Sequence, residues 1–367
     1  MHQLGEQEKA EQPSEGASPG SLWAFSQDDA VSVHTNPRSE RTKVREIRRR
    51  TELRAKKSLG QHFLVDREVL QETYRLAQTF ASRYDLRALV ELGPGWGALT
   101  QYLVQVGPAC TLIEVDPEAC QVLQERFSLE ELETSQISPT DQVNHTAYTN
   151  HTDCANHNEG WSWKKDQLTL LEADALTFPW ESFCEKQGCP EGKGLGFFSN
   201  IPYQITKEVW ERAFLFLPRA PMGLLMQKEA ADRLLAGPGS KEYGPLSALS
   251  AGLFAKRKLR NVGPGAFDPP PKVQSTLVAL DPLDPEDSAY RKKLEILRLN
   301  LAERQAFYRF LQEVFGQRRK KVRNCLDPER MSEISLEIRP LTESRAEALN
   351  VEDLFQIFWN LRCKMKG

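Results

Sequence analysis

The sequence lacks any long apolar run: no stretch approaches the roughly 18 consecutive apolar residues that a membrane-spanning helix needs. It is also poor in cysteine, with seven scattered residues, an odd number that favours free thiols in a reducing compartment over a disulfide framework. The N-terminal segment is acidic and polar, so the sequence indicates neither a secretory signal nor an Arg-rich transit peptide. We therefore expect a cytoplasmic protein that does not enter the membrane.

Charge of one sign is not in large excess either. The net charge is −3, so the overall charge predicts no polyanionic partner. Two local runs are strongly basic: residues 38–57 hold ten Lys and Arg against three Glu, and residues 318–323 read RRKKVR. Such runs on a nearly neutral chain are typical of a nucleic-acid-binding face, and equally of solvated helix faces and flexible tails. The charge pattern alone leaves both interpretations open.

The order of apolar and polar segments predicts the domain organisation. The chain has 367 residues, more than the roughly 250–300 at which a single core usually stops growing. Residues 1–50 lack apolar periodicity and are predicted to be mostly disordered. Residues 51–284 predict one α/β domain, in which a polar segment at about 129–166 is interpreted as an inserted surface loop without regular structure. Residues 285–367 show only helical patterns and predict a small all-helical C-terminal domain.

Apolar runs and helical patterns alternate within the α/β domain. Buried strands are predicted at residues 88–93, 110–116, 168–174, 194–203, 222–227 and 275–281. Helices are predicted at residues 97–107 and at residues 117–127, where Pro117 suits the first helical turn. Strands that alternate with helices form βαβ units, so we expect a doubly wound, mostly parallel sheet.

The first candidate site lies where the first of these strands becomes a helix. The motif there, ELGPGWG at residues 91–97, is rich in glycine, which lets the backbone turn tightly and approach a ligand at a helix N-terminus. Glu114 ends the next strand, at a distance along the chain from Gly93 that lets its carboxylate accept both hydroxyls of a ribose. The glycines alone favour an ordinary tight turn, whereas their combination with Glu114 favours a nucleoside-type cofactor.

The spacing of the motif also bears on which cofactor it binds. A dinucleotide fingerprint places its third glycine one position later than Gly97, so the motif fits a dinucleotide poorly. Asp174 and Ala175 follow the third strand, where an acid can read an adenine amino group, although a helix N-cap explains Asp174 alone. The set of Gly93, Glu114 and Asp174 resembles the S-adenosylmethionine site of methyltransferases.

The second candidate site is Asn200-Ile201-Pro202-Tyr203, at the end of the fourth predicted strand. An exocyclic amine of a base is a poor nucleophile because its lone pair is delocalised into the ring. The Asn200 side-chain oxygen and the Ile201 carbonyl can accept both N–H hydrogens and favour a pyramidal nitrogen. The ring of Tyr203 can stack on an unstacked base, and Pro202 makes the turn rigid. A strand end followed by a turn proline explains this motif equally well.

These motifs occur in the order seen in a known family. The chain resembles the ribosomal RNA adenine N6-dimethyltransferases, and specifically their bacterial small-subunit (KsgA-type) branch. The matching segments are KKSLGQHFLVD (56–66), VELGPGWGALT (90–100), LIEVD (112–116), EADAL (172–176), SNIPY (199–203), MQKEAADRLLAGPGSKEYGPLS (226–247), FDPPPKVQST (267–276) and FGQRRKKVRN (315–324). The resemblance implies a Rossmann-like methyltransferase sheet followed by a small helical domain.

The resemblance also implies roles for individual residues. Those implied to bind S-adenosylmethionine are His62, Leu64, Gly93, Gly95, Glu114, Asp174, Ala175 and Asn200. Those implied to form the catalytic pocket for the target base are Asn200, Ile201, Pro202, Tyr203 and Phe267. Phe267 is alternatively explained as a packed loop anchor. His62 departs from the asparagine often found at its position, although both side chains can donate a hydrogen bond.

The resemblance further implies an enzyme that transfers methyl groups from S-adenosylmethionine to N6 of two adjacent adenosines near the 3′ end of small-subunit (16S) rRNA. We expect a monomer that acts on a partly assembled 30S particle, with phosphate contacts from Arg318, Arg319, Lys320, Lys321 and Arg323. No metal site is expected, because the His and Cys residues at 145–157 lie in the polar insert. Two alternatives stay open: a large-subunit adenine methyltransferase that confers macrolide-type resistance, and an assembly or transcription factor whose catalysis is secondary.

Overall fold

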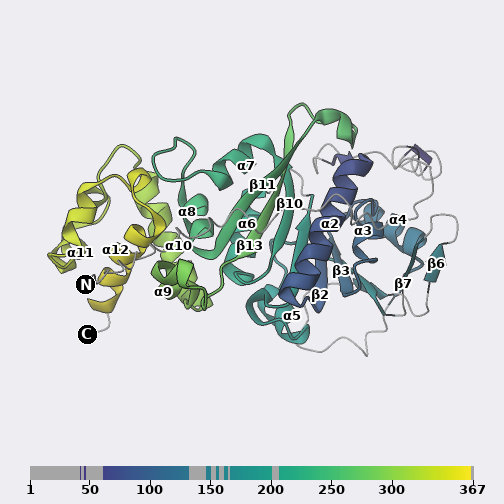
Figure 1. Cartoon of the computed structure of the whole chain (residues 1–367), viewed down its shortest axis with the longest axis horizontal. Helices are drawn as coiled ribbons and strands as arrows, with labels where there is room; N and C mark the ends of the chain where they lie inside the picture. The colour runs from purple at the N-terminus through teal and green to yellow at the C-terminus, as the bar shows by residue number, and fades with distance from the viewer. Residues whose placement is uncertain are drawn as a thin grey trace, which may run out of the picture.

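A central sheet with helices on both faces makes up the middle of the molecule, and further helices follow at one end (Figure 1). The computed structural model describes residues 42, 45–46, 61–131, 146–149, 154–156, 161–163, 166–200 and 206–364. The predicted disordered segment 1–50 therefore lies outside the described residues, apart from Thr42, Arg45 and Glu46.

The main sheet contains nine strands within the described residues, and its central part is parallel. The strands β10, β9, β2, β3 and β8 run parallel to one another, whereas β13 is antiparallel to β10, and β11 is antiparallel to β13. The predicted doubly wound, mostly parallel sheet is thus confirmed. In spatial order the strands are β11 (Phe254–Val262), β13 (Ser275–Pro282), β10 (Met222–Gln227), β9 (Leu195–Ser199), β2 (Ala88–Leu92), β3 (Ala109–Glu114), β8 (Leu168–Glu172), β5 (Thr146–Thr149) and β4 (Glu130–Glu131).

The chain reverses its winding direction between β2 and β9. From β2 it adds β3 and then β8 on one side, and it later adds β9 and β10 on the other. Leu92 of β2 is the register partner of both Ile113 of β3 and Ser199 of β9. The carboxyl ends of these three strands therefore meet at a topological switch point, which is where open α/β sheets bind ligands.

Helices cover both faces because successive strand residues point into two different apolar cores. Leu89 and Phe198 belong to the core under α2, α3 and α4, whereas their neighbours Val90 and Phe197 belong to the core under α5, α6 and α8. In chain order, the helices of this part are α2 (Arg67–Tyr84), α3 (Thr100–Leu103), α4 (Pro117–Phe127), α5 (Trp180–Lys186), α6 (Thr206–Phe216), α7 (Lys228–Leu235) and α8 (Pro245–Leu253), with short 3-10 turns η5 (Pro190–Gly192) and η6 (Pro264–Ala266).

The helix after the glycine motif is shorter than predicted. The predicted helix 97–107 is regular only over α3, with turns on either side. Gly97 and Gly107 have φ values of +77° and +119°, which a right-handed helix excludes. The next helix agrees with the prediction: α4 begins at Pro117, and Asp116 caps it by accepting a backbone N–H at 3.1 Å.

The C-terminal part is helical, as its sequence pattern predicts. α10 and α12 pack against α8, and their apolar side chains join the same core as α5, α6 and α8 (Figure 1). The domain boundary near residue 285 stays a prediction. The helices are α9 (Leu294–Leu297), α10 (Leu301–Gly316), α11 (Pro328–Glu333) and α12 (Val351–Lys364), with 3-10 turns η7 (Ser288–Lys293), η8 (Val322–Asn324), η9 (Arg339–Glu343) and η10 (Ala346–Ala348).

A buried arginine joins α10 to the half of the molecule that contains the sheet. The Arg304 side chain is 2% exposed, and its guanidinium donates to the Leu299 carbonyl of its own segment. Its Nε donates to the Leu215 carbonyl at 2.9 Å, and Nη2 lies 2.8 Å from Glu191 Oε1. Because Leu215 belongs to α6 and Glu191 to η5, Arg304 holds α10 against both elements.

The expectation of an unstructured loop at about 129–166 is wrong for its described residues. β5 extends the sheet from the edge of β8, and β4 pairs with β5 in turn. β6 (Cys154–Asn156) and β7 (Trp161–Trp163) form a separate antiparallel pair. An edge strand offers unpaired backbone groups that a short polar segment can complete, and so short a strand leaves no hydrophobic pattern in the sequence.

Candidate active site

The glycine motif forms the turn between β2 and α3 at the switch point. Gly93, Gly95 and Gly97 all have positive φ, of +67°, +56° and +77°, a conformation that favours glycine. A Cβ on Gly97 would lie 2.5 Å from the Phe127 ring, so this glycine is needed for packing against α4. A Cβ on Gly93 would meet no atom within 4 Å. The turn therefore borders open space at Gly93, which is the side a ligand can approach.

Glu114 ends β3 beside this turn and is buried, with 6% exposure. Its Oε2 accepts the Gly95 N–H at 3.0 Å, and its Oε1 accepts the N–H groups of Val115 and Asp116, both at 3.0 Å. Burial raises the pKa of the Glu114 carboxyl, and the three N–H groups oppose that rise because they stabilise the anion. A carboxylate has about four acceptor positions, so acceptor capacity remains for a ligand hydroxyl.

Asp174 follows the neighbouring strand β8 and lies at the same edge of the sheet. The Ala173 N–H donates to the Glu114 carbonyl at 2.8 Å, which joins the two strand ends. Asp174 Oδ1 accepts the Leu176 N–H at 2.8 Å and closes a turn in which Ala175 is buried. The structure thus places Asp174 and Glu114 at adjacent strand ends, and it also gives Asp174 a contact of the capping type.

Asn200 follows β9 directly and is half-buried. The hydroxyl of Ser199, the last residue of β9, donates to the carbonyl of its register partner Leu92 at 3.0 Å. Gly93 and Asn200 are the next residues on these two paired strands, so the glycine turn and the start of the second motif lie side by side. The other members of that motif, Ile201, Pro202 and Tyr203, lie outside the described residues.

The segment before α2 packs against the glycine turn. The Phe63 ring stacks on the Trp96 ring, with centroids 4.0 Å apart and an interplanar angle of 20°. Phe63 lies between His62 and Leu64, so this contact places their segment beside the glycine turn; cofactor binding by His62 and Leu64 themselves stays a prediction. His62 also reaches a different loop, because its Nδ1–H donates to the Pro269 carbonyl at 2.8 Å.

Phe267 belongs to β12 (Phe267–Asp268), which pairs with β1 (Phe63–Leu64) in a separate two-stranded sheet. Leu64 and Phe267 are register partners, and Phe267 is only 1% exposed. In this structure its ring is the packed anchor of its loop, which is the alternative interpretation of the sequence. A role of Phe267 in the pocket for the target base stays a prediction.

Sequence reasoning missed other residues of this site. Gln61 Nε2 donates to Asp116 Oδ2 at 2.7 Å, and Val115 is 48% exposed although it is apolar. Glu91 is buried, and its Oε2 accepts the Thr100 hydroxyl at 2.6 Å. Burial raises the pKa of Glu91 to about 8. Two of these residues carried a signal in the sequence: Glu91 is an acid inside an apolar strand, and Val115 is an apolar residue between two acids.

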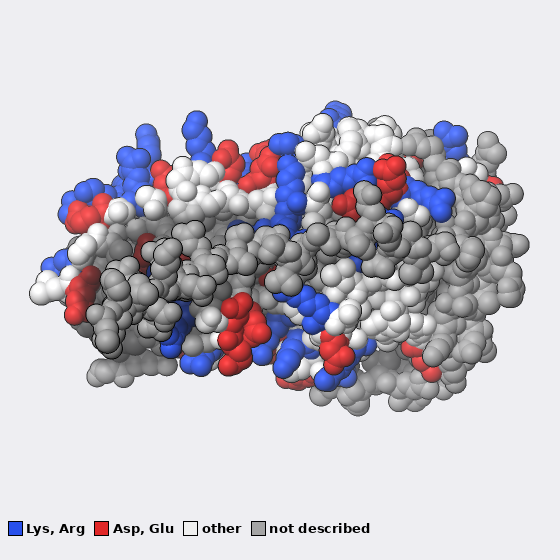
Figure 2. Space-filling model, viewed as in Figure 1, with Lys and Arg blue, Asp and Glu red and all other residues white. Residues whose placement is uncertain are grey.

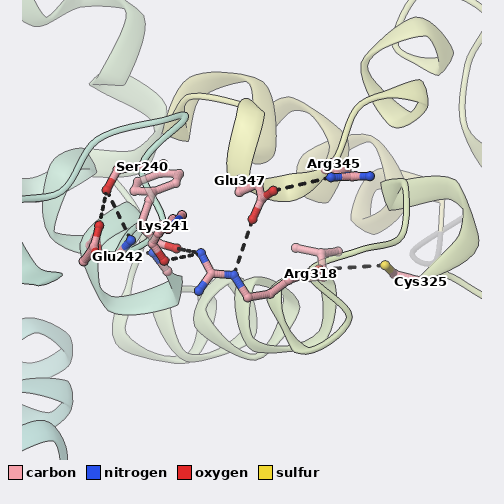
Figure 3. Close-up of polar contacts among 11 residues, drawn as sticks. Ser240, Lys241, Glu242, Arg318, Cys325, Arg345 and Glu347 are labelled. Carbon is pink, nitrogen blue, oxygen red and sulfur yellow. Dashed lines mark hydrogen bonds and ion pairs between the residues drawn. The ribbon is translucent and has the colours of Figure 1, made fainter.

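The basic side chains of residues 318–323, which follow α10, differ in how many polar contacts they make, and Arg318 makes the most. Its guanidinium donates to the carbonyls of Lys241 and Tyr243, at 2.5 and 3.2 Å, and its Nε lies 3.4 Å from Glu347 Oε2 (Figure 3). Arg318 therefore bridges the loop between α7 and α8 to η10. This arrangement leaves it less suited to a phosphate than the sequence predicts.

The remaining four basic residues divide into two pairs. Lys321 and Arg323 share Glu343, at 3.1 and 2.6 Å. Arg319 and Lys320 are exposed, and neither makes an ion pair within the part of the chain that the structure describes. Over the visible face of the molecule, Lys and Arg are interspersed with Asp and Glu (Figure 2). Phosphate binding stays a prediction, and Arg319 and Lys320 are its best-placed members.

Two further kinds of feature are absent from the residues that the structure describes. None of their helices is both long and apolar enough to cross a membrane. No group of three or more of their His, Cys, Asp and Glu side chains is arranged to hold a metal ion.

The fold and the site together define a class of protein. A mostly parallel sheet with helices on both faces is the Rossmann-like fold of methyltransferases. The glycine turn, the two strand-end acids and Asn200 lie at its switch point, where open α/β sheets bind ligands. Within this class, the chain belongs to the ribosomal RNA adenine dimethylase family, whose family model matches residues 52–362.

Named relatives agree with this membership. Ribosomal RNA small subunit methyltransferase A of Pseudomonas aeruginosa is 32% identical over 280 residues, which are 75% of this chain and 82% of that protein. The protein of the same name from Chlorobium limicola is 27% identical over 323 residues, 86% of this chain and 96% of the relative. The crystal structure of a dimethyladenosine transferase from Plasmodium falciparum matches with a TM-score of 0.56 and 18% identity, over 83% of this chain and 98% of that one. This likeness shows the fold.

Proposed function

We propose that the protein transfers methyl groups from S-adenosylmethionine to N6 of two adjacent adenosines near the 3′ end of small-subunit (16S) rRNA, giving N6,N6-dimethyladenosine. The position of Asn200 is the observation that carries this proposal. β2 and β9 are paired up to Leu92 and Ser199, so Asn200 follows beside the glycine turn. A cofactor at the turn and a base amine at Asn200 would therefore be neighbours. The proposed substrate follows from the relatives, which are ribosomal RNA small subunit methyltransferases A.

The residues around the turn fit S-adenosylmethionine. Glu114 keeps acceptor capacity for ribose hydroxyls beyond its three backbone hydrogen bonds. Val115, with 48% exposure, offers an apolar surface to an adenine ring, and the backbone at Gly93 borders open space. When bound, S-adenosylmethionine supplies an electrophilic methyl group on a positively charged sulfur.

The contribution of the chain itself is orientation and electrostatics. The Asn200 side-chain oxygen and the Ile201 carbonyl would accept both N6 hydrogens, which concentrates the lone pair on the nitrogen. Tyr203 would stack on the base after it leaves the RNA stack. A methylated amine nitrogen that still carries its extra proton is strongly acidic and loses that proton to water, so no general base is needed. The second transfer requires a pocket that accepts a nitrogen already carrying one methyl group.

The proposed partner is a partly assembled 30S particle, and the proposed compartment is the cytoplasm in which such particles form. Exposed basic side chains after α10, led by Arg319 and Lys320, would contact its phosphates. We assign the protein to act there as a monomer and without a metal ion. No metal is needed because the methyl group to be transferred is already activated by its sulfur.

Methyl transfer from labelled S-adenosylmethionine tests the proposal. The substrates are small subunits that lack the modification and, in parallel, naked large-subunit RNA. We expect label on N6 of adjacent small-subunit adenosines, and a rate at least about 100-fold lower for Asn200→Ala, because one aligned acceptor is lost. Label on large-subunit RNA alone would favour the resistance-type alternative. Cofactor binding without any label would favour the assembly-factor alternative.

A further inference from the structure

We propose that β1 and β12 form a clasp that couples cofactor binding to RNA binding, with His62 as the positioning residue that closes it. The clasp comprises residues 61–66 and 266–269. This inference rests on the proposed function, and it adds a mechanism by which the two substrates assist each other.

One half of the clasp lies on the cofactor site. Gln61 Nε2 donates to Asp116 Oδ2 at 2.7 Å. The Asp116 N–H in turn donates at 3.0 Å to the carboxylate of Glu114, the residue proposed to accept the ribose hydroxyls. Phe63 stacks on Trp96 within the glycine motif, and a Cβ on Gly95 would lie 3.2 Å from the Phe63 ring. Residues 61 and 63 therefore contact the two elements that would hold the nucleoside, so a ligand that orders those elements also orders this segment.

The other half of the clasp belongs to the loop that the family resemblance assigns to the target base. Besides the register pair Leu64–Phe267, the Val65 N–H donates to the Ala266 carbonyl at 2.8 Å. His62 Nδ1–H donates to the Pro269 carbonyl at 2.8 Å, beyond the end of the two-residue strand. A proline has no N–H, so this stretch of three prolines offers only carbonyl groups to a neighbouring strand. A side-chain donor such as His62 is the means of extending the pairing into it.

These contacts couple the order of the two segments, so that fixing one of them also fixes the other. With residues 61–66 ordered on the cofactor side, the loop 267–274 is fixed by its pairing to them. A loop that is already fixed loses less conformational entropy when a base binds beside it. Each ligand therefore favours the closed clasp, and by linkage each must raise the affinity for the other by the same factor. Couplings of this kind are typically 5–150-fold, and we expect about tenfold here.

Two substitutions of His62 test the assignment. His62→Leu removes the donor, whereas His62→Asn retains an N–H at the same number of bonds from Cβ as Nδ1. The measurement is the Kd for unmethylated small subunits, with and without saturating S-adenosylhomocysteine, which carries no methyl group to transfer. The ratio of interest is the Kd without S-adenosylhomocysteine divided by the Kd with it. We expect this ratio to be about ten for the wild type, at least five for His62→Asn, and below two for His62→Leu. A ratio is insensitive to any loss of cofactor affinity that the substitution itself causes. A wild-type ratio near one, or an unchanged ratio in His62→Leu, would overturn the proposal.

A second measurement needs no RNA and separates failure of the clasp from failure of the proposed function. Hydrogen exchange is followed in the full chain with S-adenosylhomocysteine alone. In the wild type we expect slower exchange in both 61–66 and 263–274, and in His62→Leu slower exchange in 61–66 only. If S-adenosylhomocysteine binds and leaves exchange in 263–274 unchanged in the wild type, the clasp is refuted whatever the RNA does. If the clasp responds and small subunits are not bound, the substrate assignment is what fails.

Discussion

Two buried glutamates near the switch point differ in what stabilises their negative charge. Glu114 accepts three backbone N–H groups, which are fixed donors that favour its anion. Glu91 accepts one hydroxyl, from Thr100. Burial raises the pKa of Glu91, and the nearby Glu114 carboxylate adds to that rise. The contrast suits their positions, because the N–H groups around Glu114 favour the anion that would accept ribose hydroxyls, whereas burial favours the protonated form of Glu91.

The raised pKa of Glu91 predicts a pH-dependent stability. Its pKa is about 8 in the folded protein and near 4.5 when solvated, so between these values the folded state retains a proton that the unfolded state releases. Stability therefore falls as the pH rises through this window, and above pH 8 the full penalty is present. Glu91→Gln cannot ionise and can still accept from Thr100. We expect its Tm relative to the wild type to rise by at least about 2 °C between pH 5 and pH 8.5. An offset that stays constant across this range would contradict the assignment.

At the scale of elements, the junction between α10 and the sheet half depends on one buried cation. Arg304 satisfies the Leu215 carbonyl at the end of α6, and it pairs with Glu191 of η5. Burial lowers the pKa of this guanidinium, and the nearby carboxylate of Glu191 opposes the shift. A buried charge with satisfied hydrogen bonds fixes how the elements meet, and removing it leaves their carbonyls without a donor.

This predicts a large difference between two arginine substitutions. Arg304→Met leaves two buried carbonyls unpaired, so we expect it to lower the free energy of unfolding by about 3 kcal/mol. Arg330→Met is the matched control, because Arg330 pairs with Glu313 at 2.7 Å while both side chains are about one-third exposed, at 31% and 36%. Its expected cost is below about 1 kcal/mol. Denaturant unfolding of the wild type and the two variants measures both decreases in the free energy of unfolding. Equal decreases would show that the buried contacts of Arg304 stabilise the fold no more than a surface ion pair does.

The elements that could be predicted from the sequence are those with a strong local pattern. The apolar runs of β2, β3 and β8 identify buried parallel strands, and the winding rule then brings Gly93, Glu114 and Asn200 to one edge. β11, with the sequence FAKRKLRNV, carries no such pattern, because its charges find partners only after folding: Arg257 lies 3.1 Å from Asp281, and Lys256 donates to the Leu234 carbonyl at 2.7 Å. The family resemblance implies a cofactor role for His62, but the contacts of residues 61–63 could not be predicted from the sequence, because their partners Asp116, Pro269 and Trp96 lie in distant segments.

At the scale of the whole molecule, RNA binding depends on which charges remain available rather than on how many there are. The net charge is −3, and acidic and basic side chains are interspersed over the visible face (Figure 2). Within the basic segment after α10, Glu343 already compensates Lys321 and Arg323, and Arg318 is bound to Glu347 and two carbonyls. A phosphate would have to compete with these contacts. Arg319 and Lys320 form no ion pair with any residue that the structure describes, so a phosphate would meet no such competition there from those residues.

The salt dependence of binding to unmethylated small subunits therefore distinguishes these residues. Each phosphate contact contributes about 0.7–0.9 to the slope of log K against log salt. Arg318→Ala is expected to lower the Tm and not only the salt slope, because it releases the loop between α7 and α8 from η10.

For the salt slope itself, replacing Arg319 and Lys320 together by alanine should reduce it by about 1.5. The matched double substitution of Lys321 and Arg323 to alanine should reduce it by less than about 1. If the variant of Arg319 and Lys320 keeps the wild-type slope, the segment after α10 is not the phosphate-binding face, and the basic run at residues 38–57 becomes the next candidate.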